Sequence, residues 1–409
     1  MFKTVRNSIL IFAVVLVLGF CLMIVTYSIP SQGPHDIIVE DAPAFVDLYP
    51  KLISKDRATQ LDLFSDAIIL SEVAYYNKNV SVIDNAMSVY GIRDDDFQEF
   101  AQGNESVIDS YPRYWHGNLF VFKVLFSFLD YGAVKILNLL FEIVLIFGIS
   151  KLMYDGNLKS YIIPFLLSLC LIHPEAIGLC LQFASVFNVM LVSVFILLRF
   201  REVLLKNNRM VYYFLVIGML TSYLDLLSYP LITFGVPMIF YVLLEQDKMT
   251  LRENILKIVL FGASWSIGYL GMWVGKWIIG SILLNQDIIA NGVNTTLFRM
   301  SNAERVGEGV AFSILDPLRL NLSIYFEKVY LIVFALIGVY YLKRLWPLDF
   351  SRDNLKNALP LVIISLIPFL WYVVVVNHSS VHYWFTYRIL VIFFFALMCG
   401  LEYVRTIKS

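Results

Sequence analysis

The sequence has 409 residues, of which 59% are hydrophobic and 15% are charged, and its mean hydropathy is +0.73. Soluble domains carry about 25% charged residues, so the composition excludes a soluble globular protein and indicates a polytopic membrane protein. A net charge of −1 and the lack of a basic cluster give no reason to expect nucleic acid as a partner. The four cysteines lie in apolar runs and predict neither disulfides nor a metal site.

The N-terminal apolar run predicts a first transmembrane helix, domain 1–28. The run is longer than the core of a typical signal peptide and lacks an Ala-x-Ala site. We therefore expect an uncleaved span rather than a leader. A polar stretch of residues 29–132 follows before the next apolar run of spanning length.

Runs of about 17–25 apolar residues predict about ten transmembrane helices. They lie near 7–28, 133–153, 161–178, 182–199, 210–226, 229–245, 255–278, 325–341, 358–376 and 384–403. Lys and Arg gather in alternate connections, whereas 178–182, 226–229 and 376–384 hold none. The positive-inside rule then places both termini in the cytoplasm. The fold class expected is an all-α polytopic membrane protein whose bundle spans 133–409 and carries outer loops 285–324 and 377–388.

The first outer loop, 29–132, is acidic and rich in aromatic residues, which indicates a folded segment rather than disorder. Leu63, Ala67, Leu70 and Ala74 form one apolar stripe at helical spacing. The loop is therefore expected to be partly helical, with interfacial helices. The apolar segment 118–130 is too short to span with ease.

Asp62 and Asp66 are four residues apart on this predicted helix, so both carboxylates face one side. Neighbouring like charges raise the proton affinity of at least one of them, which suits a general base or a shared cation. An ordinary solvated acidic face explains the same spacing.

The segment 111–117 contains Arg113, Tyr114, Trp115 and His116 just before the chain returns to the membrane. Tyr and Trp are expected at a bilayer surface, whereas Arg is disfavoured in an outer loop. Arg fits a phosphate group with paired donors, and His adds a donor or transfers a proton. Interfacial anchoring with a cation–π contact is the alternative.

The second aromatic and basic segment is the hairpin 377–388, with Asn377, His378, His382 and Arg388. The two histidines have the spacing of metal ligands, but no third ligand lies nearby, so no metal site is predicted. Arg388 lies just inside an apolar span, where a charge is costly and usually has a partner. The alternative is that its side chain extends to the bilayer surface.

Lys276 is a similar intramembrane cation, with the same alternative. Asp225, at an outer helix end, could cap a helix, line a cavity or pair with Lys276 or Arg388. The sequence contains no phosphate loop, dinucleotide fingerprint or zinc-protease motif, and its inner loops are too short for a nucleotide-binding domain. Any substrate must therefore come from the bilayer or from outside.

This layout resembles the GT-C superfamily of integral membrane glycosyltransferases. The resemblance rests on the first span, the long first loop and the segments around Asp62–Asp66, 111–117 and 377–388, which are closest to a poorly characterised Gram-positive bacterial group. It implies an inverting transfer of a sugar from a polyprenyl-phosphate donor to a cell-envelope glycan at the outer face of the bacterial cell membrane. Family acids commonly lie nearer the first span, where Asp36, Glu40 and Asp41 stand here, so the identity of the base stays open.

The resemblance assigns provisional roles to these residues. Asp66 or Asp62 would deprotonate the acceptor, and four basic residues would bind the donor phosphate. The basic residues are Arg113, His116, Lys276 and Arg388, and the residues expected to contact substrate are Tyr114, Trp115, Asp225, Asn377, His378 and His382. No specific cofactor is predicted and a divalent cation stays open, and the expected partners are the lipid-linked donor, the glycan acceptor and membrane lipids. The alternatives are a lipid-linked glycan flippase and a polysaccharide polymerase or ligase.

Overall fold

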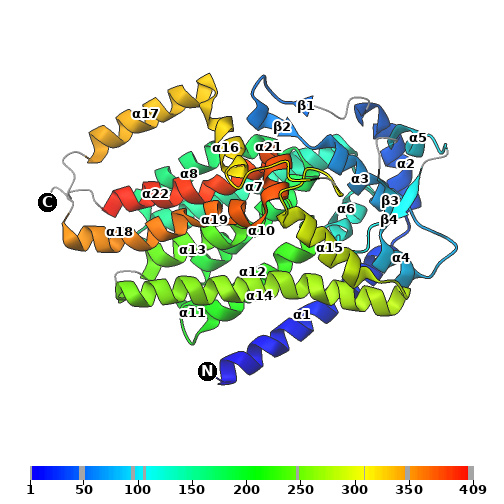
Figure 1. The fold of residues 1–409 in the computed structure, drawn as a ribbon, viewed down its shortest axis with the longest axis horizontal. Helices are drawn as coiled ribbons and strands as arrows, with labels where there is room; N and C mark the ends of the chain where they lie inside the picture. Colours follow the sequence, from blue (N-terminus) through cyan, green and yellow to red (C-terminus); the bar gives the residue numbers. More distant parts are fainter. Residues whose placement is uncertain are drawn as a thin grey trace.

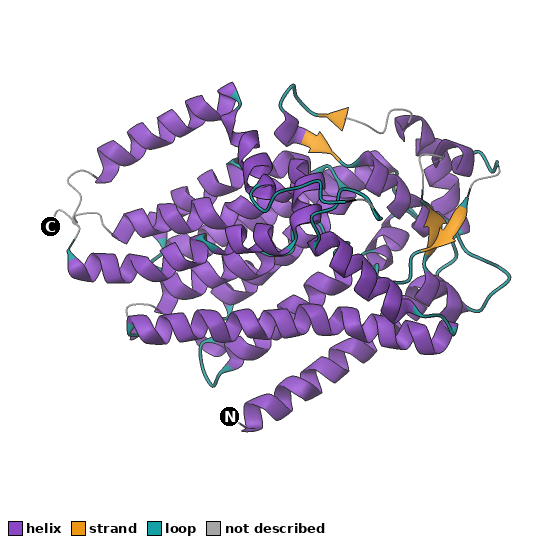
Figure 2. Cartoon of the chain, in the orientation of Figure 1, coloured by secondary structure: helices purple, strands orange, loops and turns teal. Residues whose placement is uncertain are grey.

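The structure is a computed structural model that describes residues 2–45, 51–93, 97–104, 107–245, 248–307, 309–345 and 351–403. Helices account for 77% of it, and its regular β-structure in these ranges is two pairs of short strands (Figure 2). The expectation of an all-α fold is therefore confirmed.

Six described helices or helix pairs are long and apolar enough to cross a bilayer. They are α1 (Phe2–Ser28), α7 (Tyr131–Asp155), α10 (Leu181–Arg199), α14 (Leu251–Leu284), the pair α18 (Arg352–Ser365) with α19 (Ile367–Val374), and the run from α21 (Tyr383–Thr386) to α22 (Val391–Tyr403). A multi-pass membrane protein follows from their length and composition.

The number ten is not confirmed, because four predicted spans are short or bent. Three of them form the shorter apolar helices α8 (Ile162–Cys170), α12 (Arg209–Leu224) and α13 (Ile232–Glu245). In the fourth, α16 (Asp316–Ser323) meets α17 (Lys328–Leu345) at a bend of 79°. Small elements complete the bundle: η3 (Lys159–Tyr161), α9 (Pro174–Gly178), α11 (Arg201–Leu204), η5 (Ile324–Phe326) and η6 (Tyr387–Leu390).

Helix α14 is the longest element and runs the length of the bundle (Figure 1). Its 34 residues correspond to about 50 Å, more than the roughly 30 Å hydrocarbon core of a bilayer. It packs closely on α12 because glycines meet backbone at the crossing. A Cβ atom on Gly218 would lie 2.1 Å from the carbonyl oxygen of Trp265, and one on Gly268 would lie 2.2 Å from that of Leu215. Small residues at such crossings let helix backbones approach in membranes.

The first loop folds as predicted into short helices, which gather at one end of the bundle (right in Figure 1). The stripe Leu63, Ala67, Leu70 and Ala74 is buried in α3 (Leu63–Ala74). The other elements are α2 (Gln32–Asp41), η1 (Ala42–Phe45), β1 (Lys51–Leu52), η2 (Arg57–Thr59), β2 (Gln60–Leu61), α4 (Val82–Ser88), β3 (Tyr90–Ile92), α5 (Phe97–Ala101), β4 (Ile108–Ser110) and α6 (Leu119–Leu125). Strands β1 and β2 pair antiparallel, as do β3 and β4.

Two further segments approach this end of the bundle. The loop 285–324 begins with α15 (Ile288–Met300), which packs on α14, since a Cβ on Gly292 would lie 2.4 Å from the Trp277 indole. The hairpin 377–388 contains α20 (Val376–Val381) and α21, and the amide of Asn377 donates to the carbonyl oxygen of Ser301 at 2.9 Å. Arg113 of the first loop also donates to Asn291 Oδ1 on α15 at 3.0 Å, so the first loop, the second loop and the hairpin meet at this end of the bundle.

Candidate functional site

The first loop, the loop 285–324 and the hairpin 377–388 line a cavity of about 390 Å³, here called the polar cavity. The first loop contributes Asp62 and Tyr114, α15 contributes Arg299, and the hairpin contributes His378 and His382. Gln182 enters from the start of α10. Four residues predicted from the sequence thus lie together, from segments more than 300 positions apart.

Asp62 occupies the N-cap position of α3, and its side chain is 4% exposed. One carboxylate oxygen accepts from the Ser65 amide at 3.0 Å and the other from the Ser65 hydroxyl at 2.7 Å. Burial raises the pKa of Asp62 to about 6, although the bonds from Ser65 oppose that shift. A carboxylate with a pKa near the working pH suits general-base chemistry.

Arg299 on α15 is the charged residue that the sequence analysis missed. Its Nη1 lies 3.3 Å from Asn377 Oδ1 and 3.4 Å from His382 Nε2. Within the described residues no carboxylate lies within 4.0 Å of its guanidinium group. A half-buried cation that no carboxylate neutralises can bind an anion.

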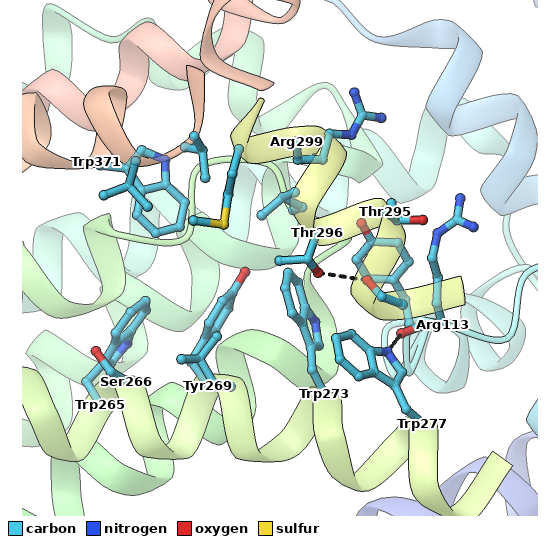
Figure 3. A pocket seen from close by; sticks show the side chains of 17 residues that line it. Arg113, Trp265, Ser266, Tyr269, Trp273, Trp277, Thr295, Thr296, Arg299 and Trp371 are labelled. Atoms are coloured by element: carbon cyan, nitrogen blue, oxygen red, sulfur yellow. Dashed lines mark hydrogen bonds between the residues drawn. The ribbon is translucent and has the colours of Figure 1, made fainter. Parts of the chain in front are cut away.

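Arg299 also lines a second cavity of about 270 Å³, here called the aromatic cavity, and Tyr114 and Leu227 line both. The floor of the aromatic cavity is a row of rings at four-residue spacing on α14: Trp265, Tyr269, Trp273 and Trp277. Consecutive ring centroids lie 4.9, 5.1 and 6.2 Å apart. Figure 3 shows this row along α14, with Arg113 and Arg299 extending away from it on the far side.

The aromatic row descends from the loops into the bundle. From Trp277 to Trp265 the helix covers about 18 Å at 1.5 Å per residue. Trp371 and Val374 of α19 close the opposite wall. The two cavities are therefore a chamber with charged side chains and a neighbouring apolar slot, and Arg299 lies in the wall of both.

Asp66 does not line either cavity and has a different environment from Asp62. Its carboxylate accepts hydrogen bonds from the Tyr131 hydroxyl at 2.7 Å, the Gln182 amide at 2.9 Å and the Leu181 amide at 3.1 Å. It thus satisfies free amides at the start of α10. The two carboxylates were expected to face one side of the helix and act together. Asp62 instead lines the polar cavity, whereas Asp66 caps α10, so the two acids do not form one site.

The segment 111–117 is built into the wall of the site. Tyr114 packs edge-on against Trp273, with ring centroids 5.7 Å apart, and the buried Trp115 donates from its indole to the Met272 carbonyl at 2.7 Å. Arg113 lines the aromatic cavity and donates to Asn291 Oδ1 at 3.0 Å, while its carbonyl accepts from the Trp277 indole at 2.9 Å. Of these residues, Arg113 and Tyr114 reach a cavity and Trp115 is structural.

His116 belongs to a buried ion network outside both cavities. Its Nδ1 lies 2.9 Å from Glu72 Oε2, and Glu72 also pairs with Arg93 at 3.0 Å. Burial lowers the pKa of His116, and the Glu72 carboxylate opposes that shift. His116 is also held at φ 54°, so the network fixes an uncommon backbone conformation.

The two intramembrane cations bind backbone carbonyls. Lys276 Nζ donates to Met87 O at 2.9 Å, near the C-terminal end of α4. Arg388 donates to Ala58 O at 3.3 Å, and its guanidinium lies 4.3 Å from the Phe183 ring centroid. Asp225 instead accepts from the Ser228 amide and hydroxyl. The pairing of Asp225 with Lys276 or Arg388 is therefore wrong.

The two histidines of the hairpin face the polar cavity, with ring centroids 5.0 Å apart. Burial lowers the pKa of His378 well below its usual value and that of His382 to about 3, and nearby Arg299 acts in the same direction. Neutral imidazoles offer hydrogen bonds, but the guanidinium beside His382 disfavours a metal ion there. Among the described residues no group of three His, Cys, Asp or Glu side chains could hold a metal.

Comparisons with known proteins add no relative to this description. No family model, no curated protein and no solved structure matches the chain.

Proposed function

We propose that the chain is a GT-C-like membrane glycosyltransferase that moves a sugar from a polyprenyl-phosphate donor to a cell-envelope glycan acceptor. The observation that carries the proposal is the position of Arg299, which lines both the chamber containing Asp62 and the neighbouring aromatic slot. The parts of a polyprenyl-phosphate sugar follow the same order. The sugar would occupy the polar cavity, the anionic phosphate would bind Arg299, and the apolar chain would enter the aromatic cavity.

Asp62 is the proposed general base. It takes the proton of the acceptor hydroxyl while that oxygen forms a bond to the anomeric carbon of the donor. The bond between this carbon and the phosphate oxygen breaks, and its electron pair leaves with the polyprenyl phosphate. Attack from the opposite face inverts the anomeric centre.

Arg299 stabilises the leaving phosphate in this scheme, with Arg113 as a second cation at the rim. Charge develops on the phosphate as the bond breaks, and a fixed guanidinium in a site of low polarity acts most strongly there. His116, Lys276 and Arg388, expected from the sequence to share this role, have other contacts. We therefore propose them as residues that hold the loops around the site.

The aromatic cavity receives the first isoprene units. Its wall of indole and phenol rings is apolar and follows α14 away from the loops. We place the site on the outer face of a bacterial cell membrane, with both termini cytoplasmic, because the positive-inside rule assigns the connections rich in Lys and Arg to the cytoplasm.

A flippase for lipid-linked glycans is the second candidate, since the bent pair α16–α17 resembles the broken helices of transporters. A polysaccharide polymerase or ligase would use the same lipid chemistry. A flippase needs no base, so its activity would persist in Asp62→Asn.

Binding of a polyprenyl phosphate tests the phosphate assignment without knowledge of the sugar. The full chain in phosphatidylcholine nanodiscs is titrated with undecaprenyl phosphate and followed by native mass spectrometry. Arg299→Ala should weaken binding at least tenfold, because a charge-assisted hydrogen bond is lost, whereas Arg299→Lys should retain part of the affinity. The matched control is Arg319→Ala on α16, where the side chain is exposed. Equal affinity of the wild type and Arg299→Ala for undecaprenyl phosphate would show that Arg299 does not bind the phosphate.

A further inference from the structure

A third cavity lies between transmembrane helices, outside the site described above. It has a volume of about 1020 Å³ and is here called the lateral cavity. Helix α10 packs on both α7 and α12, and all three helices line the cavity together with α6 and Leu204 of α11. It shares no lining residue with the polar or aromatic cavity. The lateral cavity is therefore separate from the proposed site of sugar transfer.

The lateral cavity opens on the side of the bundle. Part of its apolar lining is also exposed at the surface of the protein, with exposed fractions of 39% to 49%. These residues are Val121, Leu137, Phe141, Ile196 and Leu220. They belong to four different helices, so the opening is a gap between helices through which a lipid chain can enter from the bilayer.

The dimensions and lining of the cavity suit an acyl chain. Along α12 it extends from Arg209 to Leu224, which corresponds to about 22 Å. One leaflet contributes only about 15 Å of hydrocarbon, so a whole chain fits. Most of the lining side chains are Val, Leu, Ile or Phe. Because a chain moves here from one apolar environment to another, this lining admits lipids but does not select among them.

Selection therefore depends on the polar end of the cavity. Arg209 is the one ionisable residue in the lining besides two tyrosines. Its exposed guanidinium donates from Nη1 to Val203 O at 3.1 Å and makes no other hydrogen bond among the described residues. Tyr212, three residues further along the same face of α12, lines the cavity as well. A guanidinium beside a phenol hydroxyl offers several donors to a phosphate group.

The connection between α10 and α12 adds further positive charge at this end. It holds one acid, Glu202, and the basic residues Arg199, Arg201, Lys206 and Arg209. Within the described residues, none of these four cations has a carboxylate within 4.0 Å. Basic pockets between transmembrane helices on the cytoplasmic side bind anionic headgroups. The positive-inside rule assigns this connection to the cytoplasm.

We propose that the lateral cavity binds an anionic phospholipid of the inner leaflet. Arg209 and Tyr212 contact its phosphate, and one acyl chain lies between α7, α10 and α12. A polyprenyl phosphate of the outer leaflet would place its phosphate at the opposite end of the cavity, where Asn118 and Ser185 are neutral. The position of the charge therefore favours a lipid of the inner leaflet. This proposal does not depend on sugar transfer.

The headgroup is tested with the full chain in nanodiscs of equimolar phosphatidylglycerol and phosphatidylcholine. Native mass spectrometry measures the lipid that each released chain retains. The wild type should retain phosphatidylglycerol over phosphatidylcholine about tenfold, because the choline group adds a positive charge next to the basic connection. Arg209→Ala should retain about tenfold less phosphatidylglycerol, because a charge-assisted hydrogen bond is lost.

The matched control is Arg252→Ala on α14, which removes an exposed cation on the same predicted side but outside the cavity. It should retain phosphatidylglycerol as the wild type does. Equal retention of the two lipids by the wild type, or unchanged retention in Arg209→Ala, would overturn the proposal.

The position of the acyl chain is tested by filling the cavity without a change of charge. Val216→Trp places an indole among the lining residues of α12 and should lower the retained phosphatidylglycerol about tenfold. Its control is Val259→Trp on α14, where the side chain is 64% exposed; this variant should retain the lipid. Val216→Trp that retains phosphatidylglycerol as the wild type does would place the chain elsewhere and contradict the proposal.

Addition of undecaprenyl phosphate separates this site from the one proposed for the donor. The retained phosphatidylglycerol should stay bound, because the two lipids occupy different cavities. Displacement of phosphatidylglycerol by undecaprenyl phosphate in the wild type would assign the lateral cavity to the polyprenyl lipid and overturn the proposal. Loss of phosphatidylglycerol selectivity would leave the proposed enzyme standing, and absence of sugar transfer would leave this lipid site standing.

Discussion

Asp66 accepts a 2.9 Å hydrogen bond from the backbone amide of Gln182, whose side chain lines the polar cavity. The carboxylate acts as a cap for α10 and connects the first loop to the bundle. Asp62, four residues earlier, lines the cavity itself. The spacing of the two acids suggested one shared role. Their contacts instead indicate that Asp66 stabilises the fold, whereas Asp62 is available for chemistry in the polar cavity.

Asp66→Ala should therefore destabilise the protein. The substitution leaves the Leu181 and Gln182 amides and the Tyr131 hydroxyl without their acceptor, which costs about 1–3 kcal/mol for buried groups. The melting temperature in detergent, followed by fluorescence of the seven tryptophans, should fall by several degrees. Sugar transfer per folded molecule should stay within a fewfold of the wild type. An unchanged melting temperature would contradict the capping role.

The pH dependence of kcat/KM should follow the ionisation of Asp62. The base must be deprotonated, and burial raises its pKa to about 6, so kcat/KM should fall about tenfold for each pH unit well below 6 and level off above it. His382 should add no second step between pH 5 and 8, because burial and the nearby Arg299 lower its pKa to about 3. A profile that is flat from pH 5 to 7.5 would exclude Asp62 as the base.

Asp62 should also make the folded state less stable as the pH rises. A carboxyl whose folded pKa lies above its unfolded value of 3.8 favours folding below that value and loses this contribution as the pH rises through about 6. The shift of about two units corresponds to about 3 kcal/mol. Asp62→Asn should therefore melt at a higher temperature than the wild type at pH 7.5, and the difference should shrink at pH 5. A variant that melts lower at both pH values would contradict this sign.

The crossing of α12 and α14 should not tolerate a side chain at Gly268. A Cβ there would lie 2.2 Å from Leu215 O, so Gly268→Val must separate the helices and displace the aromatic row. Overpacking of this kind costs about 1–3 kcal/mol and occasionally more. The matched control is Gly338→Ala in α17, where no heavy atom lies within 4 Å of the added Cβ. Equal yields of folded protein and equal melting temperatures for the two variants would contradict this packing.

The sequence predicted the features that depend on local pattern. The apolar runs gave the helical membrane class, and the stripe from Leu63 to Ala74 gave α3. The same reasoning selected Asp62, Tyr114, His378 and His382, which the fold brings to one cavity. Their positions share a pattern, polar or aromatic residues in loops on one predicted side of the membrane.

Partners across the fold could not be predicted in this way. Lys276 and Arg388 were expected to bind the donor phosphate, with pairing to Asp225 or extension to the bilayer surface as alternatives. Both bind backbone carbonyls, which leave no trace in a residue pattern. The choice between Asp62 and Asp66 depends on where the start of α10 packs, a contact over more than 110 positions. Arg299 had no distinguishing neighbour in sequence. The row from Trp265 to Trp277 did carry a signal, an aromatic residue every fourth position on one helix face.

The decisive measurement for Asp62 as the base is sugar transfer from radiolabelled polyprenyl-phosphate sugars to cell-envelope fractions. Asp62→Asn and Asp66→Asn are compared with the wild type in nanodiscs. We expect Asp62→Asn to lower kcat by a factor of about a hundred or more while the protein stays folded, because the base contributes roughly that much. Asp66→Asn should keep most of its turnover per folded molecule. Turnover by Asp62→Asn within twofold of the wild type would exclude Asp62 as the base.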